Sequence, residues 1–582
     1  MTLTHRGTGD DSSEDMGDDV ELLRRRGGAG GHGSSKADTR TLPLLFSHRK
    51  LLMGLVVFLG AAALLTLGLV HEWNDASELR VVSWNIAAIN NNPFEYWITH
   101  EDADYNKLMV DVQDFISSPG ARDVAVGAVF TPAMWAELKA LMVARGWPGV
   151  DEVDALWQSD FSQRKIISGF MKDKSLGDKR LASMPDRVTN TINLINGGVT
   201  YRPTVINCFS GDMSSLPRWW GAWKAFMFDK PFTLAGGAAP TNGGAAMLSK
   251  IKRSKYPALT EAEEAISVPL QTLAQAIFDA ILVHIVNSVS PGAKWQALQR
   301  QMCVALNQRK DERTLSILSE EYEDATVIFL QETASAFVAK ALDEDAISDH
   351  YFVGKLANPD AKRDQNSLLL LRRSFFAEES LVDHTAKVMG GFDRSTPVAN
   401  GDLLAVSVTD MMGRKYLLAS FHGDTNGLAT IPVLGAVDAL AKTMPDHTLV
   451  FGLDANTHTI GSASKQGVGE FAAAFRERGY SSTWGDEPNP TSATTFNART
   501  YLQPQLQKAA RADEKESKGD KNPKDFILFP KGRFEVRAAA KDNTGERRYI
   551  EEMVFPTLKF PSDHGLISAT LHIVDTENKG GK

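Results

Sequence analysis

Apolar and polar positions divide the chain into a polar leader, one long apolar run, a mostly helical stretch and a strand-rich remainder. The apolar run, LLMGLVVFLGAAALLTLGLV at residues 51–70, contains no charge, and Thr66 is its only polar side chain. At about 1.5 Å rise per residue it would form a helix about 30 Å long, the hydrocarbon thickness of a bilayer. Because the run is apolar on every face and follows a long leader, it predicts a transmembrane signal-anchor helix rather than a core helix or a cleaved signal peptide.

Charges on either side of this run predict its orientation. His48, Arg49 and Lys50 precede it directly, whereas Arg80 is the only cation close behind it. The positive-inside rule then places the leader in the cytoplasm and the large C-terminal region in a lumen or outside the cell. The large region lacks an Asn-x-Ser/Thr glycosylation acceptor and is nearly free of cysteine, so neither feature adds support to this orientation.

The leader, residues 1–47, is rich in Gly, Ser and Asp, and a segment of this composition is expected to be disordered. Residues 18–23, DDVELL, resemble an acidic dileucine sorting signal, which would direct the protein to an endosomal, lysosomal or vacuolar membrane. The alternative is a solvated acidic run with two incidental leucines.

A mostly helical stretch separates the first two strand-like runs of the large region. Residues 79–90 form an apolar run that ends in polar side chains. The next comparable strand, 325–330, begins about 230 residues later. One crossover needs far fewer residues. Residues 262–289 have helical periodicity, with Pro269 expected to start or kink the helix. We therefore expect residues 100–310 to be a helical insertion.

Two features of this insertion allow more than one interpretation. The aromatic segment 219–228, WWGAWKAFMF, favours packing between insertion and core over a surface for membrane or substrate. Cys208 and Cys303 are the only cysteines, so at most one disulfide can form within the chain, and an all-cysteine metal site is excluded. Two buried thiols are the favoured interpretation of this pair.

The remainder of the chain alternates short apolar runs with turns and two helical segments. Charged, breaker-rich residues 508–524 predict a loop within it. This pattern by itself predicts a mixed α/β fold. The expected strands are 367–371, 403–408, 416–421, 449–453, 526–529 and 566–573, and the expected helices are 431–442 and 468–478.

Composition narrows the function only slightly. With 43% apolar and 23% charged residues among 582, most of the chain should fold as an ordinary globular protein. The formal net charge of -9 disfavours tight non-specific binding of nucleic acid. It does not exclude a nuclease, because a bound metal brings positive charge into a carboxylate-lined site.

Polar residues that can handle metals or protons follow several of the apolar runs directly. Groups of this kind can hold a metal, activate water and stabilise developing charge. Asp454 and Asn456 are two apart, so an extended strand would point both side chains to the same face. The segments are Ser-Trp-Asn at 83–85, Phe-Leu-Gln-Glu at 329–332, Phe-His at 421–422, Asp-Ala-Asn at 454–456 and Pro-Ser-Asp-His at 561–564.

In this order, the segments resemble the endonuclease/exonuclease/phosphatase superfamily, the metal-dependent phosphoesterases built like deoxyribonuclease I. The resemblance implies an α/β (α+β) fold, a four-layer β-sandwich spanning residues 79–574 and interrupted by the insertion at 100–310. It covers about residues 79–92 and 320–574, and not the insertion. A departure is Leu453, which stands where many relatives have Gly directly before the aspartate.

The resemblance also implies a divalent metal, Mg²⁺ with Mn²⁺ as the alternative. Glu332 would be its principal ligand, Asp563 would assist, and Asn85 would lie near both metal and phosphate. Oxygen ligands of this kind suit Mg²⁺.

The remaining roles implied by the resemblance concern water and phosphate. Asp454 would align or activate the attacking water, and Asn456 would hold a phosphate oxygen. His422 and His564 would contact the phosphate, with Asp525 orienting His564. Three weaker candidates are Asp424, Asn366 and Arg499, each of which could instead be an ordinary surface or turn residue.

The expected function is hydrolysis of a phosphoester by direct in-line attack of water. The superfamily's core serves several substrates, so nucleic acid and phospholipid or inositol phosphate both stay open. Tethering to the bilayer through residues 51–70 favours lipid headgroups, whereas a nuclease in a degradative compartment needs little positive charge. The alternative from another class is a catalytically silent membrane receptor or scaffold that retains the fold. Protein partners are not indicated by the sequence.

Overall fold

We analysed a computed structural model, which describes residues 77–237, 239–356, 365–393, 395–504 and 519–574. The chain divides into two compact units, Met1–His71 and Glu72–Lys582, and all described residues belong to the second. The predicted leader (1–47) and signal-anchor helix (51–70) lie outside the described residues.

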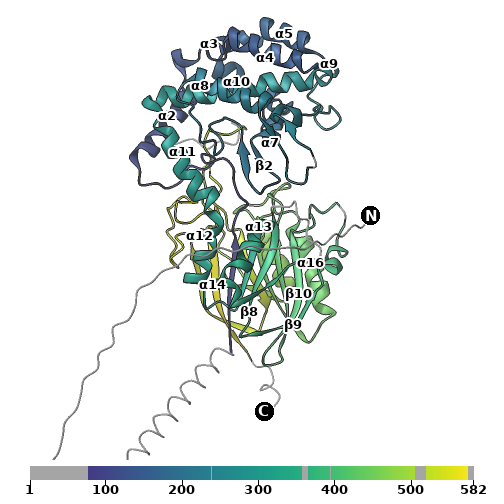
Figure 1. Ribbon diagram of the computed structural model, residues 1–582. Coiled ribbons are helices and arrows are strands. Elements are labelled where there is room, and N and C mark those ends of the chain that lie inside the picture. The colour runs from purple at the N-terminus through teal and green to yellow at the C-terminus, as the bar shows by residue number, and fades with distance from the viewer. Residues whose placement is uncertain (1–76, 238, 357–364, 394, 505–518, 575–582) are drawn as a thin grey trace, which may run out of the picture. The chain divides into compact units, whose positions relative to one another are not determined.

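Two six-stranded sheets form the core of the molecule (Figure 1). Both contain a central parallel pair, β1 with β6 and β11 with β12, among otherwise antiparallel neighbours. In order across the first sheet, the strands are β15 (Phe534–Asp542), β16 (Leu566–Ile573), β1 (Glu78–Asn85), β6 (Val327–Thr333), β8 (Asn366–Arg372) and β7 (Tyr351–Gly354). Those of the second are β13 (Tyr480–Ser482), β14 (Asp525–Pro530), β12 (His447–Asp454), β11 (Lys415–His422), β10 (Leu403–Asp410) and β9 (Phe376–Asp383).

The sheets pack face to face through one apolar cluster. Val81 and Phe329 from the first sheet and Leu418 and Val450 from the second are all at most 1% exposed in this cluster. At Gly452 the two sheets approach so closely that an added Cβ would lie 2.4 Å from the Phe329 ring. A larger residue at this position would therefore force the sheets apart, which explains the glycine within an otherwise bulky apolar strand.

Helices cover the outer faces of both sheets, so the core has four layers, as the resemblance implies. The second sheet is covered by α15 (Thr385–Met389), α16 (Thr430–Lys442) and α17 (Val468–Glu477). Helices α12 (Lys310–Ser316), α13 (Ser335–Asp343) and α14 (Asp345–Ser348) lie over the first. The predicted mixed α/β class and each strand and helix expected within 320–574 are confirmed, with shifts of a few residues at their ends.

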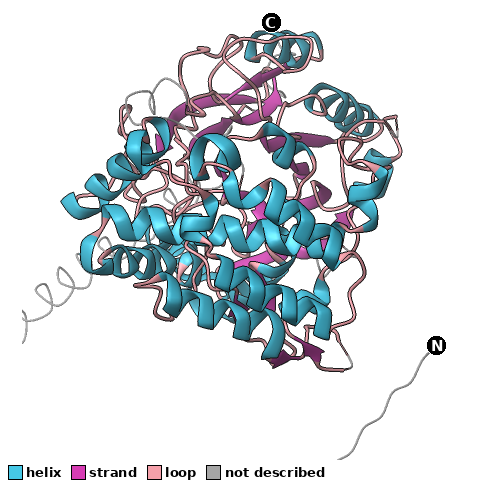
Figure 2. Cartoon of the chain, turned by 90° about the horizontal axis from the view of Figure 1, so that it is seen from above, coloured by secondary structure: helices cyan, strands magenta, loops and turns pink. Residues whose placement is uncertain are grey.

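Residues 100–310, which lie between β1 and β6 in the sequence and are called the insertion below, are mostly helical and lie over one end of the sheets (Figures 1 and 2). Its apolar side chains and those of the first sheet's outer face belong to a single buried cluster. The helices are α2 (Ala103–Ser117), α3 (Val126–Val129), α4 (Pro132–Ala144), α5 (Val150–Ser159), α6 (Lys174–Asp178), α7 (Ser183–Thr189), α8 (Leu216–Lys224), α9 (Glu261–Ala265), α10 (Ser267–Val289) and α11 (Trp295–Cys303). Two short hairpins join them, β2 (Thr191–Asn193) with β3 (Val199–Tyr201) and β4 (Pro231–Phe232) with β5 (Thr241–Asn242).

Helix α10 runs through the middle of the insertion. Among the described residues it is the one helix long and apolar enough to cross a membrane, and 78% of its most apolar window is buried inside the protein. It begins immediately after a break at Ile266, with Pro269 in its first turn, as the sequence predicts. Helix α10 is therefore the core helix of the insertion.

The aromatic segment 219–228 is buried rather than a surface for membrane or substrate, but the predicted packing between insertion and core is wrong, because its partners lie within the insertion. Trp219 and Trp223 are fully buried, and their indole N–H groups donate to Pro203 O at 2.9 Å and to Asp279 Oδ2 at 3.0 Å. This segment therefore stabilises the insertion itself rather than its junction with the sheets.

The prediction of two free thiols is wrong. Cys208 and Cys303 form a disulfide, with their Cα atoms 5.6 Å apart, although 95 residues separate them in sequence. The bond joins the loop before α8 to the C-terminal end of α11. Their proximity is a product of helix packing across the insertion, so the spacing of the two cysteines carries no signal of it.

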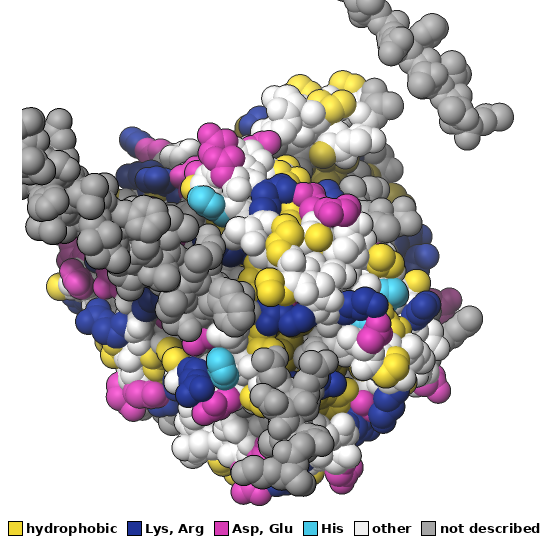
Figure 3. Space-filling view, turned by 90° about the horizontal axis from the view of Figure 1, so that it is seen from below, with side chains coloured by type: hydrophobic (Ala, Val, Ile, Leu, Met, Phe, Trp, Pro, Cys, Tyr) yellow, Lys and Arg dark blue, Asp and Glu magenta, His cyan; other side chains and the backbone are white. Residues whose placement is uncertain are grey.

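The far end of the core, seen from below, carries interspersed apolar, basic and acidic side chains (Figure 3). On this end, Met411 and Met412 of the β10–β11 turn are 60% and 66% exposed. Charges of both signs are mixed over the part of this surface that Figure 3 shows.

Candidate active site

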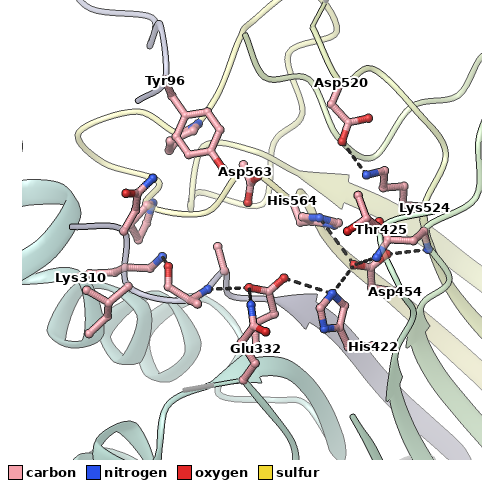
Figure 4. Close-up of a pocket in the computed structure, with 18 of the residues that line it drawn as sticks. Tyr96, Lys310, Glu332, His422, Thr425, Asp454, Asp520, Lys524, Asp563 and His564 are labelled. Atoms are coloured by element: carbon pink, nitrogen blue, oxygen red, sulfur yellow. Dashed lines mark hydrogen bonds and ion pairs between the residues drawn. The ribbon is translucent and has the colours of Figure 1, made fainter. Parts of the chain in front are cut away.

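The polar residues predicted from strand ends meet at one edge of the core, below the insertion. Parallel strands deliver their C-terminal residues to the same edge of a sheet, and here β1 and β6 end beside β11 and β12. A cavity of about 700 Å³ opens at this edge. Five of the predicted site residues line it in Figure 4: Glu332, His422, Asp454, Asp563 and His564. Asn456 also lines it, whereas Asn85 and Asp525 do not line it and instead form hydrogen bonds with Asp454 and His564.

Asp454 lies at the centre of this constellation and is fully buried. Its Oδ2 accepts hydrogen bonds from Asn85 Nδ2 at 2.9 Å and from Asn456 Nδ2 at 3.3 Å. The two-residue spacing does bring Asp454 and Asn456 together, but not on an extended strand. β12 ends at Asp454, and Asn456 adopts a left-handed conformation with φ +48°. Instead, a turn brings the two side chains together, and in this turn the Asn456 N–H donates to Asp454 Oδ1 at 2.8 Å.

Glu332 is placed by an irregularity at the end of β6. The register between β6 and β8 shifts between Leu330 and Thr333, and Glu332 has a φ of +56°, which is uncommon for a residue with a Cβ. This conformation turns its carboxylate into the cavity, where Oε2 accepts from the Ala88 N–H at 2.8 Å and Oε1 from Asn85 Nδ2 at 3.1 Å. Local strain at this position marks it as a site residue.

The surroundings of Glu332 keep it ionised. Burial alone would raise its pKa, but His422, the Ala88 N–H and the Asn85 amide outweigh burial and hold the pKa at about 2. His422 Nε2 lies 3.2 Å from Glu332 Oε1 and 3.7 Å from Asp454 Oδ2, so this ring bridges the two carboxylates. The cavity wall therefore carries fixed negative charge next to a histidine.

His564 is held between two aspartates. Its Nδ1 lies 3.1 Å from Asp525 Oδ2, and its Nε2 lies 3.6 Å from Asp454 Oδ2. Although burial lowers the pKa of this histidine, Asp525 and Asp454 raise it to about 10. An imidazolium with Nε2 toward the cavity is the result, with Asp525 fixing the ring orientation.

The charge of His564 can be measured directly. An opposite charge favours the protonated ring, so in an NMR titration His564 should stay protonated at pH 8, where an ordinary histidine near pKa 6.5 is neutral. Asp525→Asn should lower its pKa by more than one unit. His572, on the opposite end of β16, serves as the reference histidine in the same spectra. A neutral His564 at pH 7 in the unmodified protein would contradict the assignment.

Asp563 faces the cavity from the other side of His564. Its Oδ2 accepts from the Tyr96 hydroxyl at 2.9 Å and from Asn497 Nδ2 at 3.4 Å. Burial and the nearby Asp563 raise the pKa of Tyr96, which keeps this hydroxyl a hydrogen-bond donor. Asp563 thus has an oriented carboxylate at the cavity surface.

The three weaker candidates have structural partners. Arg499 lines the cavity but pairs with Glu95, and its guanidinium lies 5.3 Å above the Tyr96 ring. Asn366 donates to Thr333 O at 3.0 Å, which supports the irregular end of β6. Asp424 accepts from the Ala429 N–H at 2.7 Å and so organises the turn after β11. These contacts favour supporting roles for all three.

Four cavity residues were missed by sequence reasoning. Tyr96 follows the breaker after β1, and Lys310 begins α12, where a lone lysine in a polar helix gives no signal. Asp520 and Lys524 form an ion pair at 2.5 Å, in which Lys524 is buried and Asp520 is partly exposed. Both fall within the predicted loop 508–524, of which residues 519–524 are described. Only Lys524, directly before Asp525, stands beside a motif from which it could have been suspected.

The residues present fit a hard divalent cation best at Glu332 and Asp563. Carboxyl and imidazole atoms of Asp454, Asp525 and His564 also lie within 4.8 Å of one another. However, His564 is an imidazolium between those two aspartates, and a histidine must be neutral to bind a metal. The low pKa of Glu332, by contrast, provides an ionised oxygen ligand facing the cavity.

Comparison with family models matches part of the insertion. A family model described as "Domain of unknown function (DUF8234)" matches residues 123–300, within the insertion. No curated protein matches the chain. Activity must therefore be argued from the side chains of the cavity.

Solved structures similar to the chain include members of the endonuclease/exonuclease/phosphatase family. A humanized D. rerio TDP2 is 14% identical and covers 46% of this chain and 94% of its own, with a TM-score of 0.30. An endonuclease/exonuclease/phosphatase family protein from Bacteroides thetaiotaomicron is 12% identical over 46% of this chain and 92% of its own, with a TM-score of 0.31. The human Nocturnin catalytic domain with bound sulfate is 14% identical and covers 45% of this chain and 87% of its own, with a TM-score of 0.31.

Proposed function

We propose that the chain is a divalent-metal-dependent phosphoester hydrolase in which water attacks phosphorus directly. The observation that carries the proposal is a single cavity edge where Glu332 and Asp454, bridged by Asn85, face His422 and the imidazolium of His564. Carboxylates able to hold a metal and prepare water therefore stand opposite groups able to stabilise a phosphate. The ordered segments that resemble the endonuclease/exonuclease/phosphatase superfamily supply these same residues.

Glu332 and Asp563 would hold the metal, with the Asn85 amide beside them. Their oxygen ligands suit Mg²⁺, with Mn²⁺ as the alternative. When bound, such an ion neutralises phosphate oxygens and lowers the barrier to attack by water. Asn85 donates to both Glu332 and Asp454, so it fixes the distance between the metal-binding and water-binding parts of the cavity.

The protein's own residues would perform the remaining work. Asp454 accepts a hydrogen bond from the attacking water, orients it toward phosphorus and takes its proton. His564, charged and aimed by Asp525, donates from Nε2 to an oxygen that gains negative charge. His422 would stabilise the phosphate from the β11 side. Asn456 would hold a phosphate oxygen, and its backbone N–H holds the turn that keeps Asp454 in place. Each role needs the orientation that the hydrogen bonds above provide.

The same proposal includes a membrane anchor at residues 51–70, with the catalytic domain lumenal or extracellular. The disulfide between Cys208 and Cys303 supports this orientation, because such bonds persist in oxidising compartments. An endosomal, lysosomal or vacuolar membrane is the proposed location. In sealed vesicles, the large region should resist added protease until detergent is supplied. Its digestion in intact vesicles would reverse the orientation.

Nucleic acid and phospholipid or inositol phosphate are the two substrate classes proposed. The experiment uses the full chain in detergent, assayed with single-stranded DNA, RNA, sphingomyelin and inositol phosphates, with Mg²⁺ or with EDTA. We expect turnover of at least one class that EDTA abolishes. Metal-independent turnover would contradict the mechanism. No turnover of any substrate by a folded preparation would favour the silent receptor or scaffold instead.

A further inference from the structure

Lys310 places an ammonium group of the insertion inside the catalytic cavity. It is the first residue of α12, it lines the cavity together with Leu306 from the preceding turn, and it is only 3% exposed. Figure 4 shows its side chain reaching toward Glu332 from the side opposite Lys524. The strands that carry the other site residues do not supply this charge, since Lys310 is both the last residue of the insertion and the first residue of α12.

The hydrogen bonds of Lys310 leave much of its donor capacity unused. An ammonium has three N–H donors. Among the described residues, Nζ forms one hydrogen bond, with Ala88 O at 3.2 Å, and no ion pair. Its neighbour Asp311 is already paired with Lys340 at 2.7 Å. A buried ammonium that forms a single hydrogen bond and no ion pair within the described part of the chain is energetically unfavourable, so an anionic ligand in the cavity would stabilise it.

Lys310 is also tied to the proposed metal ligand. The Ala88 peptide accepts from Lys310 through its carbonyl and donates through its N–H to Glu332 Oε2 at 2.8 Å. Burial lowers the pKa of Lys310 to about 8, against the opposing influence of Asp563 and Glu332. Lys310 Nζ is thus linked through a single peptide to a carboxylate that would hold the metal, with N–H donors left for an anion in the cavity.

We propose that Lys310 binds an anionic oxygen of the phosphoester substrate, so that the helical insertion completes the substrate site of the core. This inference rests on the proposed phosphoesterase function. The Cys208–Cys303 disulfide anchors the end of α11, one short turn before α12, and so helps to hold Lys310 at the cavity. The insertion therefore contributes a binding residue as well as covering the site.

The test compares Lys310→Met with Arg309→Met in the full chain. The Arg309 side chain is 69% exposed and pairs with Glu312, so its variant removes the same charge from the neighbouring position outside the cavity. Affinity for inorganic phosphate is measured calorimetrically at fixed Mg²⁺, and a separate titration gives the affinity for Mg²⁺ alone. The melting temperature shows that both variants are folded.

Lys310→Met should weaken phosphate binding at least tenfold and leave Mg²⁺ affinity within about threefold, whereas Arg309→Met should change neither. With any substrate that is turned over, Lys310→Met should raise KM, and Lys310→Arg should restore part of the lost affinity. Unchanged phosphate affinity in folded Lys310→Met would overturn the inference. Phosphate binding is measured without turnover. An inactive wild-type chain would therefore contradict the proposed function, while the phosphate affinities of the wild type and Lys310→Met would still decide this inference.

Discussion

Replacing Asp454 with asparagine should lower kcat/KM for phosphoester hydrolysis by about a thousandfold, with little change in fold. The substitution keeps the shape of the side chain and removes the charge that would take the proton from water. General acid–base groups contribute rate factors of about 10²–10⁴, and Asp454 also sustains the cation on His564. Steady-state kinetics of the purified full chain, with a melting curve for each variant, provide the measurement.

Asp446 provides the matched control. It lies just before the N-terminal end of β12, is 56% exposed and pairs with Lys415 at 2.7 Å. Asp446→Asn thus removes one carboxylate near the opposite end of the strand that Asp454 terminates. Its activity should equal that of the wild type. Strong hydrolysis by Asp454→Asn, or an equal loss in Asp446→Asn, would remove Asp454 from its assigned role.

Arg202→Met should destabilise the insertion by about 3–5 kcal/mol, because breaking a buried ion pair leaves uncompensated charge behind. Arg202 is fully buried, and it donates to Asp279 Oδ2 at 2.8 Å and to Asp186 Oδ1 at 2.6 Å. Asp279 is itself fully buried and also accepts from Trp223. Loss of the guanidinium would leave both aspartates among the packed helices without their positively charged partner. Denaturant unfolding followed by tryptophan fluorescence measures the effect.

Two further variants separate charge from packing in this network. Arg218 pairs with Asp212 on the surface, its side chain is 66% exposed, and Arg218→Met should change stability by no more than about 0.5 kcal/mol. Adding Asp279→Asn to Arg202→Met should recover part of the loss, since one of the stranded charges is removed. If Arg202→Met is as stable as the wild type, the network does not hold the insertion together.

The sequence predicts the interior of the sheets and misses their edges. Each strand expected within 320–574 is buried in the centre of a sheet, where continuous apolar runs are required. The strands not anticipated are β15 and β7 at the two edges of the first sheet, and β13 and β9 at the edges of the second. Edge strands bury less of their surface. β15 and β9, for example, are mostly exposed, so their apolar signal is weak.

The site residues also separate into those that the sequence predicts and those that it does not. Residues at the ends of apolar strands, such as Glu332, Asp454 and His564, can be recognised in the sequence, because a polar group directly beside a buried strand is costly unless it has a partner or a function. Their conformations are not recognisable, since the left-handed φ of Glu332 and Asn456 depends on a register shift and a turn. Lys310 enters the cavity because α12 packs over the first sheet, and no local pattern in the sequence records that packing.

The most direct test of the account is the dependence of hydrolysis on Mg²⁺ in the full chain, compared between the wild type and Glu332→Gln. The wild type should be inactive after metal removal and recover along a saturable Mg²⁺ curve. Glu332→Gln, which retains shape but loses the charge of the principal ligand, should need at least tenfold more Mg²⁺ or fail to recover. Hydrolysis that persists in EDTA, or an identical Mg²⁺ curve for Glu332→Gln, would contradict a metal-dependent phosphoesterase at this site.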